Sequence, residues 1–162
     1  MKQIRLNLWF DTEAEEAARF YVSVFKDARI VRVTNCPAVG QEVHGTPAGS
    51  VMTGEFEVNG QPFLALNRGP AFRFSEALSL EVTGADQAEI DYYWQELSEG
   101  GDPSAQQCGS LKDRYGLSWQ IVPEGWEEML HHPERERTER AFRAMLEMKK
   151  LDIAGLKRAI DG

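Results

Sequence analysis

LNLWFDTEAEEAARFYVSVF, residues 6–25, joins two different periodicities across a short acidic turn. From Leu6 to Phe10 every second residue is apolar and belongs to one side of the chain, the pattern of a half-buried strand. Thr12 followed three residues later by Glu15 forms a capping box, which predicts that a helix begins there. The apolar residues that follow recur at helical spacing: Ala14, Ala17, Tyr21 and Phe25. The stretch therefore predicts a strand followed directly by a helix.

Three further strand signals follow this helix. Residues 29–34 (RIVRVT) predict a second strand, and a loop rich in Gly and Pro comes after them. Residues 50–58 and 62–67 flank Asn59-Gly60, a strong hairpin signal because both turn positions tolerate a positive φ. The chain is thus expected to complete a βαβββ module by about residue 68.

The same order of patterns then starts again. A shift of 72 residues needs no gap to align the apolar positions of strand and helix: Leu6, Leu8, Phe10, Phe20, Tyr21 and Phe25 fall on Leu78, Leu80, Val82, Tyr92, Tyr93 and Leu97. Asp86 and Glu89 form a second capping box. A shorter match, at a shift of 56 residues, aligns Leu64 with Gln120. Strand, turn and helix that stay in phase indicate an internal repeat.

These patterns predict an α+β fold made of two tandem βαβββ modules, which form cupped mixed β-sheets with outer helices, plus C-terminal helices. The modules are expected at about residues 1–70 and 76–125. Together they would make one paired domain, residues 1–125, followed by a C-terminal helical extension, residues 126–162.

Within the extension, Asp152 is the predicted cap of a last short helix. Leu151 before the cap and Leu156 inside the helix are placed for a hydrophobic staple. Met145 and Met148 form an apolar stripe that could cover a sheet edge or contact a partner.

The composition excludes several classes of protein. The chain has 162 residues and a net charge of −8, which argues against binding to nucleic acid or to anionic lipid, because both need clustered basic residues. No apolar run approaches the roughly 20 residues of a membrane helix, and the first ten residues lack the apolar core of a signal peptide. Cys36 and Cys108 are typical of reduced thiols. We therefore expect a cytoplasmic protein.

Five segments of the chain resemble one family closely: LWFDTEAEEAARFYVSVF, GEFEVNGQPFLALNRGP, DYYWQELSEGG, QCGSLKDRYGLSWQIVP and AMLEMKKLDIAGLKRA. They resemble PhnB-like proteins of the glyoxalase/bleomycin-resistance (vicinal oxygen chelate, VOC) superfamily, a group that often carries the label 3-demethylubiquinone-9 3-methyltransferase. The resemblance implies a small cupped sheet in each module, helices outside, and a homodimer. Relatives often have Trp where this chain has Ser110, so one wall of the implied pocket differs.

Metalloenzymes of this superfamily place one ligand on each of four strands, two in each module. The resemblance carries these positions to Asn7, Leu64, Ser79 and Gln120. None is His, Glu or Asp, the side chains that divalent cations prefer. The sequence therefore predicts no catalytic metal at this position and no cofactor, although Glu81, which faces the same way as Ser79, could support a weak site.

The same strands carry apolar side chains and a few polar ones, the composition of a small-molecule pocket. The predicted ligand-binding residues are Asn7, Trp9, Leu64, Leu66, Ser79 and Gln120. Glu81 and Ser118 belong to the same side of the predicted strands. Gln120 is expected to face Asn7 and Ser79, where its amide could donate to and accept from a ligand. In the alternative interpretation, these side chains bond one another or water and fill the cup.

We therefore expect a metal-independent protein that binds a small, partly apolar molecule in its cup. One alternative is an enzyme of the glyoxalase/dioxygenase-like type that acts on a small, quinone-like substrate, with Glu81 as the catalytic acid or base. Another is an assembly role through the C-terminal helices. Methyl transfer is not favoured, because the turns between strand and helix lack the Gly-rich motif of Rossmann-like enzymes.

The remaining reactive side chains predict no further site. His44 lies in the Gly/Pro-rich loop, and His131 and His132 are adjacent in the tail, so that few groups converge on any of them. Trp119 is expected to point toward the helix layer, opposite Gln120. Cys108 is expected in a strand, as an inert thiol.

Overall fold

The computed structural model describes residues 4–39, 45–130 and 133–162. The chain forms two compact units, Met1–Arg73 and Phe74–Gly162. Within the described ranges, no helix combines the length and the apolarity needed to cross a bilayer. The predicted α+β class with two mixed sheets and helices is confirmed. The three histidines lie outside the described residues.

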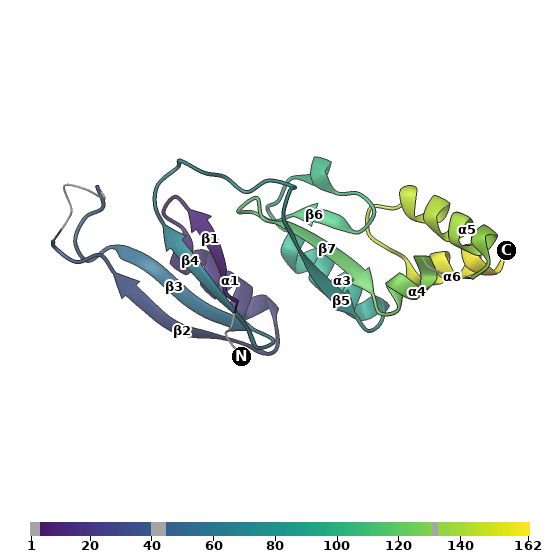
Figure 1. Ribbon diagram of the computed structural model, residues 1–162, viewed down its shortest axis with the longest axis horizontal. Helices are drawn as coiled ribbons and strands as arrows, with labels where there is room; N and C mark the ends of the chain where they lie inside the picture. The colour runs from purple at the N-terminus through teal and green to yellow at the C-terminus, as the bar shows by residue number, and fades with distance from the viewer. Residues whose placement is uncertain (1–3, 40–44, 131–132) are drawn as a thin grey trace. The chain divides into compact units, whose positions relative to one another are not determined.

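In the part of the chain that the structure describes, the first unit contains one helix and one sheet (Figure 1). Its elements, in chain order, are β1 (Leu6–Phe10), α1 (Ala14–Val24), β2 (Ala28–Asn35), β3 (Val51–Val58) and β4 (Gln61–Asn67). In the described residues, the strand order is β1-β4-β3-β2. β1 lies parallel to β4, and the other neighbours are antiparallel. The hairpin between β3 and β4 has the predicted turn, with φ of 48° at Asn59 and 76° at Gly60.

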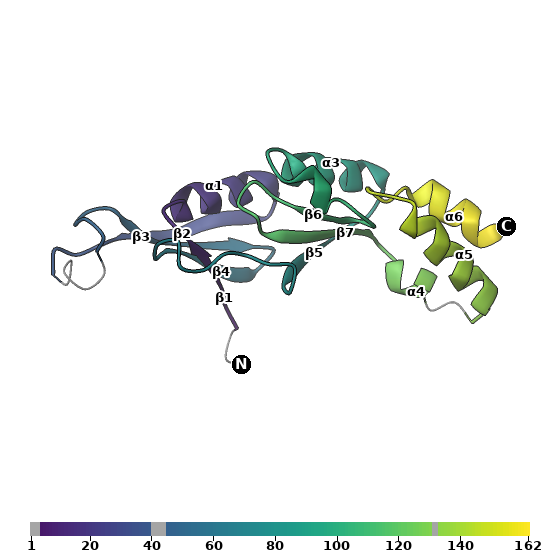
Figure 2. The same ribbon diagram turned by 90° about the horizontal axis from the view of Figure 1, so that it is seen from above.

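The core of the first unit lies between α1 and one face of this sheet, as Figure 2 shows. The helix buries the predicted face, including Ala14, Ala17, Tyr21 and Val24. Tyr21 stacks on Phe56 with ring centroids 5.8 Å apart. Gly54 of β3 lies under the helix, where an added Cβ would be 3.4 Å from Cβ of Ala18, so the glycine permits close packing.

The predicted capping box at the start of α1 is wrong. Glu13 takes the N-cap position, and its carboxylate accepts from the backbone N–H of Thr12. The first helical N–H, at Ala14, donates instead to Oδ1 of Asn67 at the end of β4, over 2.8 Å. Nδ2 of Asn67 in turn donates to the carbonyl of Val51. One amide from a distant strand thus satisfies the helix start and ties it to two strands.

The second unit repeats the order strand, helix, strands. Its elements are β5 (Ser79–Gly84), α3 (Gln87–Ser98), a 3₁₀ turn η1 (Pro103–Ala105), β6 (Ser110–Lys112), β7 (Ser118–Pro123), α4 (Trp126–Leu130), α5 (Arg135–Leu146) and α6 (Ile153–Asp161). The described strands form a sheet in the order β5-β7-β6, with β5 parallel to β7 as β1 is to β4. This sheet has three strands where the repeat predicted four, and η1 occupies the corresponding part of the chain.

The predicted cap of α3 is confirmed. Oδ1 of Asp86 accepts from the N–H of Glu89, and the Glu89 carboxylate accepts from the N–H of Ala85. Cys108, however, does not lie in a strand as predicted. Together with Gly109 it forms a tight turn with positive φ at both residues, 52° and 85°, between Gln107 and Ser110.

Within the second unit, the C-terminal helices pack against β7 through a small apolar cluster: Val122, Met145, Leu151 and Leu156. Leu151 and Leu156 are fully buried, and Asp152 accepts from the N–H of Ala154, so the predicted staple and cap are confirmed. The chain before α6 is also held by polar bonds. The N–H groups of Cys108 and Gly109 donate to the carbonyls of Met148 and Lys149.

Candidate functional site

Each sheet has one face packed on its helix and one face turned away from it, here called the open face. In the first unit, the strand register pairs Asn7 with Leu64 and Trp9 with Leu66. Leu8, between Asn7 and Trp9, is buried on the helix side. The four predicted residues of this unit therefore share the open face, on two adjacent parallel strands.

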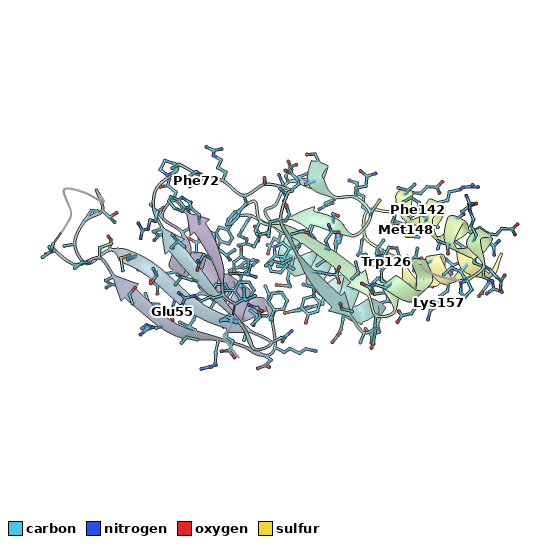
Figure 3. All side chains as sticks on the ribbon, in the orientation of Figure 1. Glu55, Phe72, Trp126, Phe142, Met148 and Lys157 are labelled. Atoms are coloured by element: carbon cyan, nitrogen blue, oxygen red, sulfur yellow. The ribbon has the colours of Figure 1, made fainter. Side chains whose placement is uncertain are left out.

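Trp9 is fixed in place on this face. Its indole N–H donates to the carbonyl of Gly69 over 2.8 Å. Its ring meets Phe72 edge to face, with centroids 4.9 Å apart. Phe72, labelled in Figure 3, is 66% exposed. Phe72 follows β4 in a segment without periodicity, so no pattern in the sequence points to it. The pair presents apolar aromatic surface to solvent.

The rest of the open face of the first sheet carries alternating charges. The Glu55 carboxylate, labelled in Figure 3, lies 2.8 Å from the guanidinium of Arg32 and 3.6 Å from that of Arg5. Arg29 pairs with Glu57 over 3.0 Å. Four of these side chains border an open hollow of about 370 Å³: Arg5, Arg29, Glu55 and Glu57. The alternation in residues 54–58 (GEFEV) is the sequence signal that Glu55 and Glu57 share a face.

In the second unit, the register arranges six polar side chains in two rows across the open face. The first row contains Glu81 of β5, Gln120 of β7 and Ser110 of β6. The second row contains Ser79, Ser118 and Lys112 in the same strand order. We call these six residues the polar grid. Trp119, which alternates with the grid residues of β7, is buried on the helix side as predicted.

The predicted residues Ser79, Glu81 and Gln120 therefore share one face. The β5 neighbour of Gln120 is Glu81, two residues beyond Ser79. Ser79 and Glu81 are two residues apart, and residues separated by an even number point to the same face of a strand. Gln120 therefore has Glu81 as its direct neighbour and still shares a face with Ser79. The hydroxyl of Ser110 donates to Oε1 of Gln120 over 2.8 Å. Gln120 thus bonds to a neighbouring side chain, as the alternative interpretation predicts for the pocket residues.

Two further polar side chains of the grid differ sharply in their bonding. Lys112 forms an ion pair with Glu76, and this pair holds the pKa of the Glu76 carboxyl below its usual value, chiefly through the hydrogen bond from the ammonium group. The hydroxyl of Ser118 is buried and has no hydrogen-bond partner among the described residues. Buried hydroxyls nearly always have a hydrogen-bond partner, so the Ser118 hydroxyl is an exception among the described residues.

The positions that the resemblance carries over from metalloenzymes hold neutral side chains in both units. In the first, Asn7 lies beside the aliphatic Leu64. In the second, Ser79 and Gln120 lie in different rows, with Glu81 as the grid's one carboxylate. Neutral amides and hydroxyls bring no charge to offset dehydration of a divalent ion. Among the residues that the structure describes, no group of three His, Cys, Asp or Glu is placed to bind a metal.

Solved structures with similar folds identify the class of protein. The PhnB protein from Bacillus cereus is 32% identical, with a TM-score of 0.63, and the match covers 75% of this chain and 99% of that one. Protein PA1353 from Pseudomonas aeruginosa is 21% identical, with a TM-score of 0.53, over 76% and 98% of the two chains. The chain therefore has the fold of the PhnB protein.

The family itself is shown by sequence. Residues 2–122 match the model of the 3-demethylubiquinone-9 3-methyltransferase family, and the chain belongs to that family. The match ends within β7, so the C-terminal helices lie beyond it. No curated protein matches the chain.

Proposed function

We propose that this protein is a metal-independent small-molecule-binding protein whose open sheet faces hold the ligand. The observation that carries the proposal is the aromatic pair of half-buried Trp9 and exposed Phe72, beside Leu64 and Leu66 on the open face of the first sheet. Anchored aromatic and aliphatic side chains with a few polar groups nearby are typical of small-molecule sites. The second unit, taken by itself, has polar groups of this kind on its own open face, in the polar grid.

A thermal-shift screen of small aromatic compounds tests the proposal. A compound that binds only the native state adds RT ln(1 + [L]/Kd) to the free energy of unfolding and so raises the melting temperature. Phe72→Ala should weaken such a compound by about fivefold or more, because it removes half of the aromatic pair. Phe142→Ala is the matched control, since Phe142 is a 47% exposed aromatic residue on α5. Equal stabilisation of wild type and Phe72→Ala would contradict the proposal.

The absence of a required metal is part of the same proposal. Binding of a hit should be unchanged after dialysis against a chelator, since the superfamily's ligand positions hold neutral side chains. Metal analysis that finds one firmly held Zn, Ni, Mn or Fe ion per chain would contradict this.

A second candidate function is catalysis with Glu81 as acid or base. The supporting observation is that Glu81 lies directly beside Gln120 on the open face. If a substrate is turned over, Glu81→Gln should abolish turnover and leave the melting temperature nearly unchanged, because Glu81 is exposed. Methyl transfer from S-adenosylmethionine, which the family's name describes, is not proposed for this chain. The turns after β1 and β5 lack a Gly-x-Gly sequence.

We also propose that the protein is a cytoplasmic homodimer. Cys36 and Cys108 are both free thiols, which suits a reducing compartment. Light scattering on purified protein should give twice the mass of one chain. A monomer at micromolar concentration would refute the dimer.

A further inference from the structure

We propose that the polar grid of the second unit binds a polyhydroxylated small molecule, about one sugar-like ring in size. The inference rests on the proposed function, small-molecule binding, and names the chemical class that this face selects. It is supported by the size of the grid, the hydrogen-bond pattern of its rows and its charge.

The size of the grid follows from sheet geometry. Residues two apart on a strand are separated by roughly 7 Å, and three strands span roughly 10 Å. The two rows, Glu81–Gln120–Ser110 and Ser79–Ser118–Lys112, therefore offer polar groups over an area that matches one hydroxylated ring. Both rows consist entirely of side chains that can hydrogen-bond.

The first row presents an acceptor beside a donor. Because Ser110 donates to Oε1 of Gln120, the amide keeps its Nε2 group as a donor. The neighbouring Glu81 offers carboxylate oxygens, which only accept. A hydroxyl group both donates and accepts, so adjacent hydroxyls on a ring could bond to Glu81 and Gln120 together. Ser110 thus sets the hydrogen-bonding character of Gln120.

The second row contains the group that most needs a partner. Ser118 is only 7% exposed, and its hydroxyl has no partner among the described residues. Leaving a buried hydroxyl unpaired is unfavourable, so the native structure gains stability when something bonds to it. Ser79 and Lys112 flank Ser118 on the adjacent strands and would bond to neighbouring hydroxyls of the same ligand.

The local charge argues against a simple anion as the ligand. The ammonium group of Lys112 is already paired with Glu76, which is 74% exposed. Glu81 adds a second negative charge to the same face. With two carboxylates and one ammonium group, the face carries an excess of one negative charge. A neutral ligand rich in hydroxyls avoids this repulsion, and Glu81 strengthens its binding through charge-assisted hydrogen bonds.

The experiment compares matched probes by NMR, with amide shifts of β5, β6 and β7 as the readout. myo-Inositol carries six ring hydroxyls, cyclohexanol has the same ring with one, and inorganic phosphate tests for an anion site. We expect myo-inositol to shift the amides of the two rows in a saturable way. Cyclohexanol and phosphate should leave them unchanged at the same concentration and ionic strength.

Three variants and one control locate the site. Ser118→Ala should weaken binding of myo-inositol about threefold to tenfold, because it removes one neutral hydrogen bond. Glu81→Gln should weaken it more than tenfold, because it removes a charge-assisted one. Ser110→Ala frees the Gln120 amide to turn and should also weaken binding. Ser23→Ala, whose hydroxyl bonds to the Phe20 carbonyl on α1, should bind as wild type does.

The outcomes separate this inference from the proposed function. If aromatic compounds bind through Phe72 while myo-inositol shifts no grid amide, the inference is overturned and the proposed function stands. A response to phosphate in place of myo-inositol would identify an anion site and overturn it as well. If Ser118→Ala and Glu81→Gln bind myo-inositol as tightly as wild type does, the polyol binds elsewhere and the inference is also overturned.

Discussion

The two units close their last hairpin in different ways. In the first unit, two exposed residues, Asn59 and Gly60, turn the chain through positive φ angles alone. In the second unit, the longer turn is built around the buried carboxylate of Asp113. It accepts from the backbone N–H groups of Tyr115 and Leu117 and, over 2.8 Å, from the indole N–H of Trp119. The first turn depends on backbone freedom and the second on one buried side chain.

The open faces of the two units also differ, in the chemistry of their side chains. The first presents aromatic and aliphatic side chains at one end, with Arg–Glu pairs beside them. The second presents hydroxyls, an amide and charged groups in two rows. One module plan thus carries two kinds of surface, because the open face of a sheet contributes little to the core and leaves its side chains free to vary.

The largest difference between the units is expected at the two turns. Asp113→Ala should destabilise the second unit by about 3 kcal/mol, because it leaves buried donors, including the Trp119 indole, without an acceptor. Gly60→Ala should cost only about 1 kcal/mol, from positive φ at an exposed residue. Denaturant unfolding measures both, and hydrogen exchange assigns each loss to β7 or β4. Similar losses in the two variants would contradict the contrast between the turns.

The starts of the two helices provide the next comparison. Asn67→Ala should cost about 2 kcal/mol, since Asn67 bonds to both the N–H of Ala14 and the carbonyl of Val51. Asp86→Ala should cost about 1 kcal/mol, the usual value for a local cap. Thr12→Ala, at the predicted cap, should change stability little. A Thr12→Ala loss as large as that of Asn67→Ala would contradict this ranking.

Removing the unpaired hydroxyl should stabilise the second unit. Ser118→Ala takes away a buried polar atom that has no partner in the described chain, so we expect about 1 kcal/mol of added stability without ligand. Ser50→Ala in the first unit is the contrasting control, because that hydroxyl donates to the carbonyl of Pro47 and its loss should not stabilise. Thermal unfolding of the ligand-free protein measures both. A destabilised Ser118→Ala would mean that the hydroxyl already has a partner, such as water.

The smallest expected effect is on the stability of the protein at acidic pH. The Lys150 ammonium group, 2.5 Å from Asp91, and the Gln87 amide lower the pKa of the Asp91 carboxyl below its ordinary 3.8. The pair therefore stabilises the contact between α3 and the chain before α6 above about pH 4. This contribution is lost as the pH falls through 3.8 and the lowered pKa. Both side chains are well exposed, so we expect only about 0.3 kcal/mol. Asp91→Asn should flatten the stability curve below pH 4 by this amount, and an unchanged curve would contradict the assignment.

Much of the fold could be predicted from local patterns. The Asn59-Gly60 turn, the Asp86 cap and the staple of Leu151 and Leu156 all depend on residues close together in the sequence, and all are present. Thr12 was predicted as a cap by the same reasoning and is not one. The donor at Ala14 was met by Asn67, which is 53 residues away along the chain. A local rule has no access to such a competitor.

For the candidate site, the sequence predicts which side chains share a face of the sheet, but not which of them are neighbours across strands. Period-two alternation places Asn7 with Trp9 and Ser79 with Glu81, whatever the register of the neighbouring strands. The neighbours across strands depend on the register. Gln120 lies beside Glu81 and bonds to Ser110, and Ser118 is left without a partner among the described residues. Phe72 could not be found at all from periodicity, because it lies outside every strand.

By itself, the sequence determined that the chain is built from a repeated strand–helix–strand plan, and which side chains share each face. Both follow from periodicities that act over a few residues. Tertiary structure alone decided which distant groups meet: Asn67 with the start of α1, Asp113 with Trp119, and the two rows of the polar grid. These contacts depend on register and packing between segments far apart in the chain, and no local pattern records them.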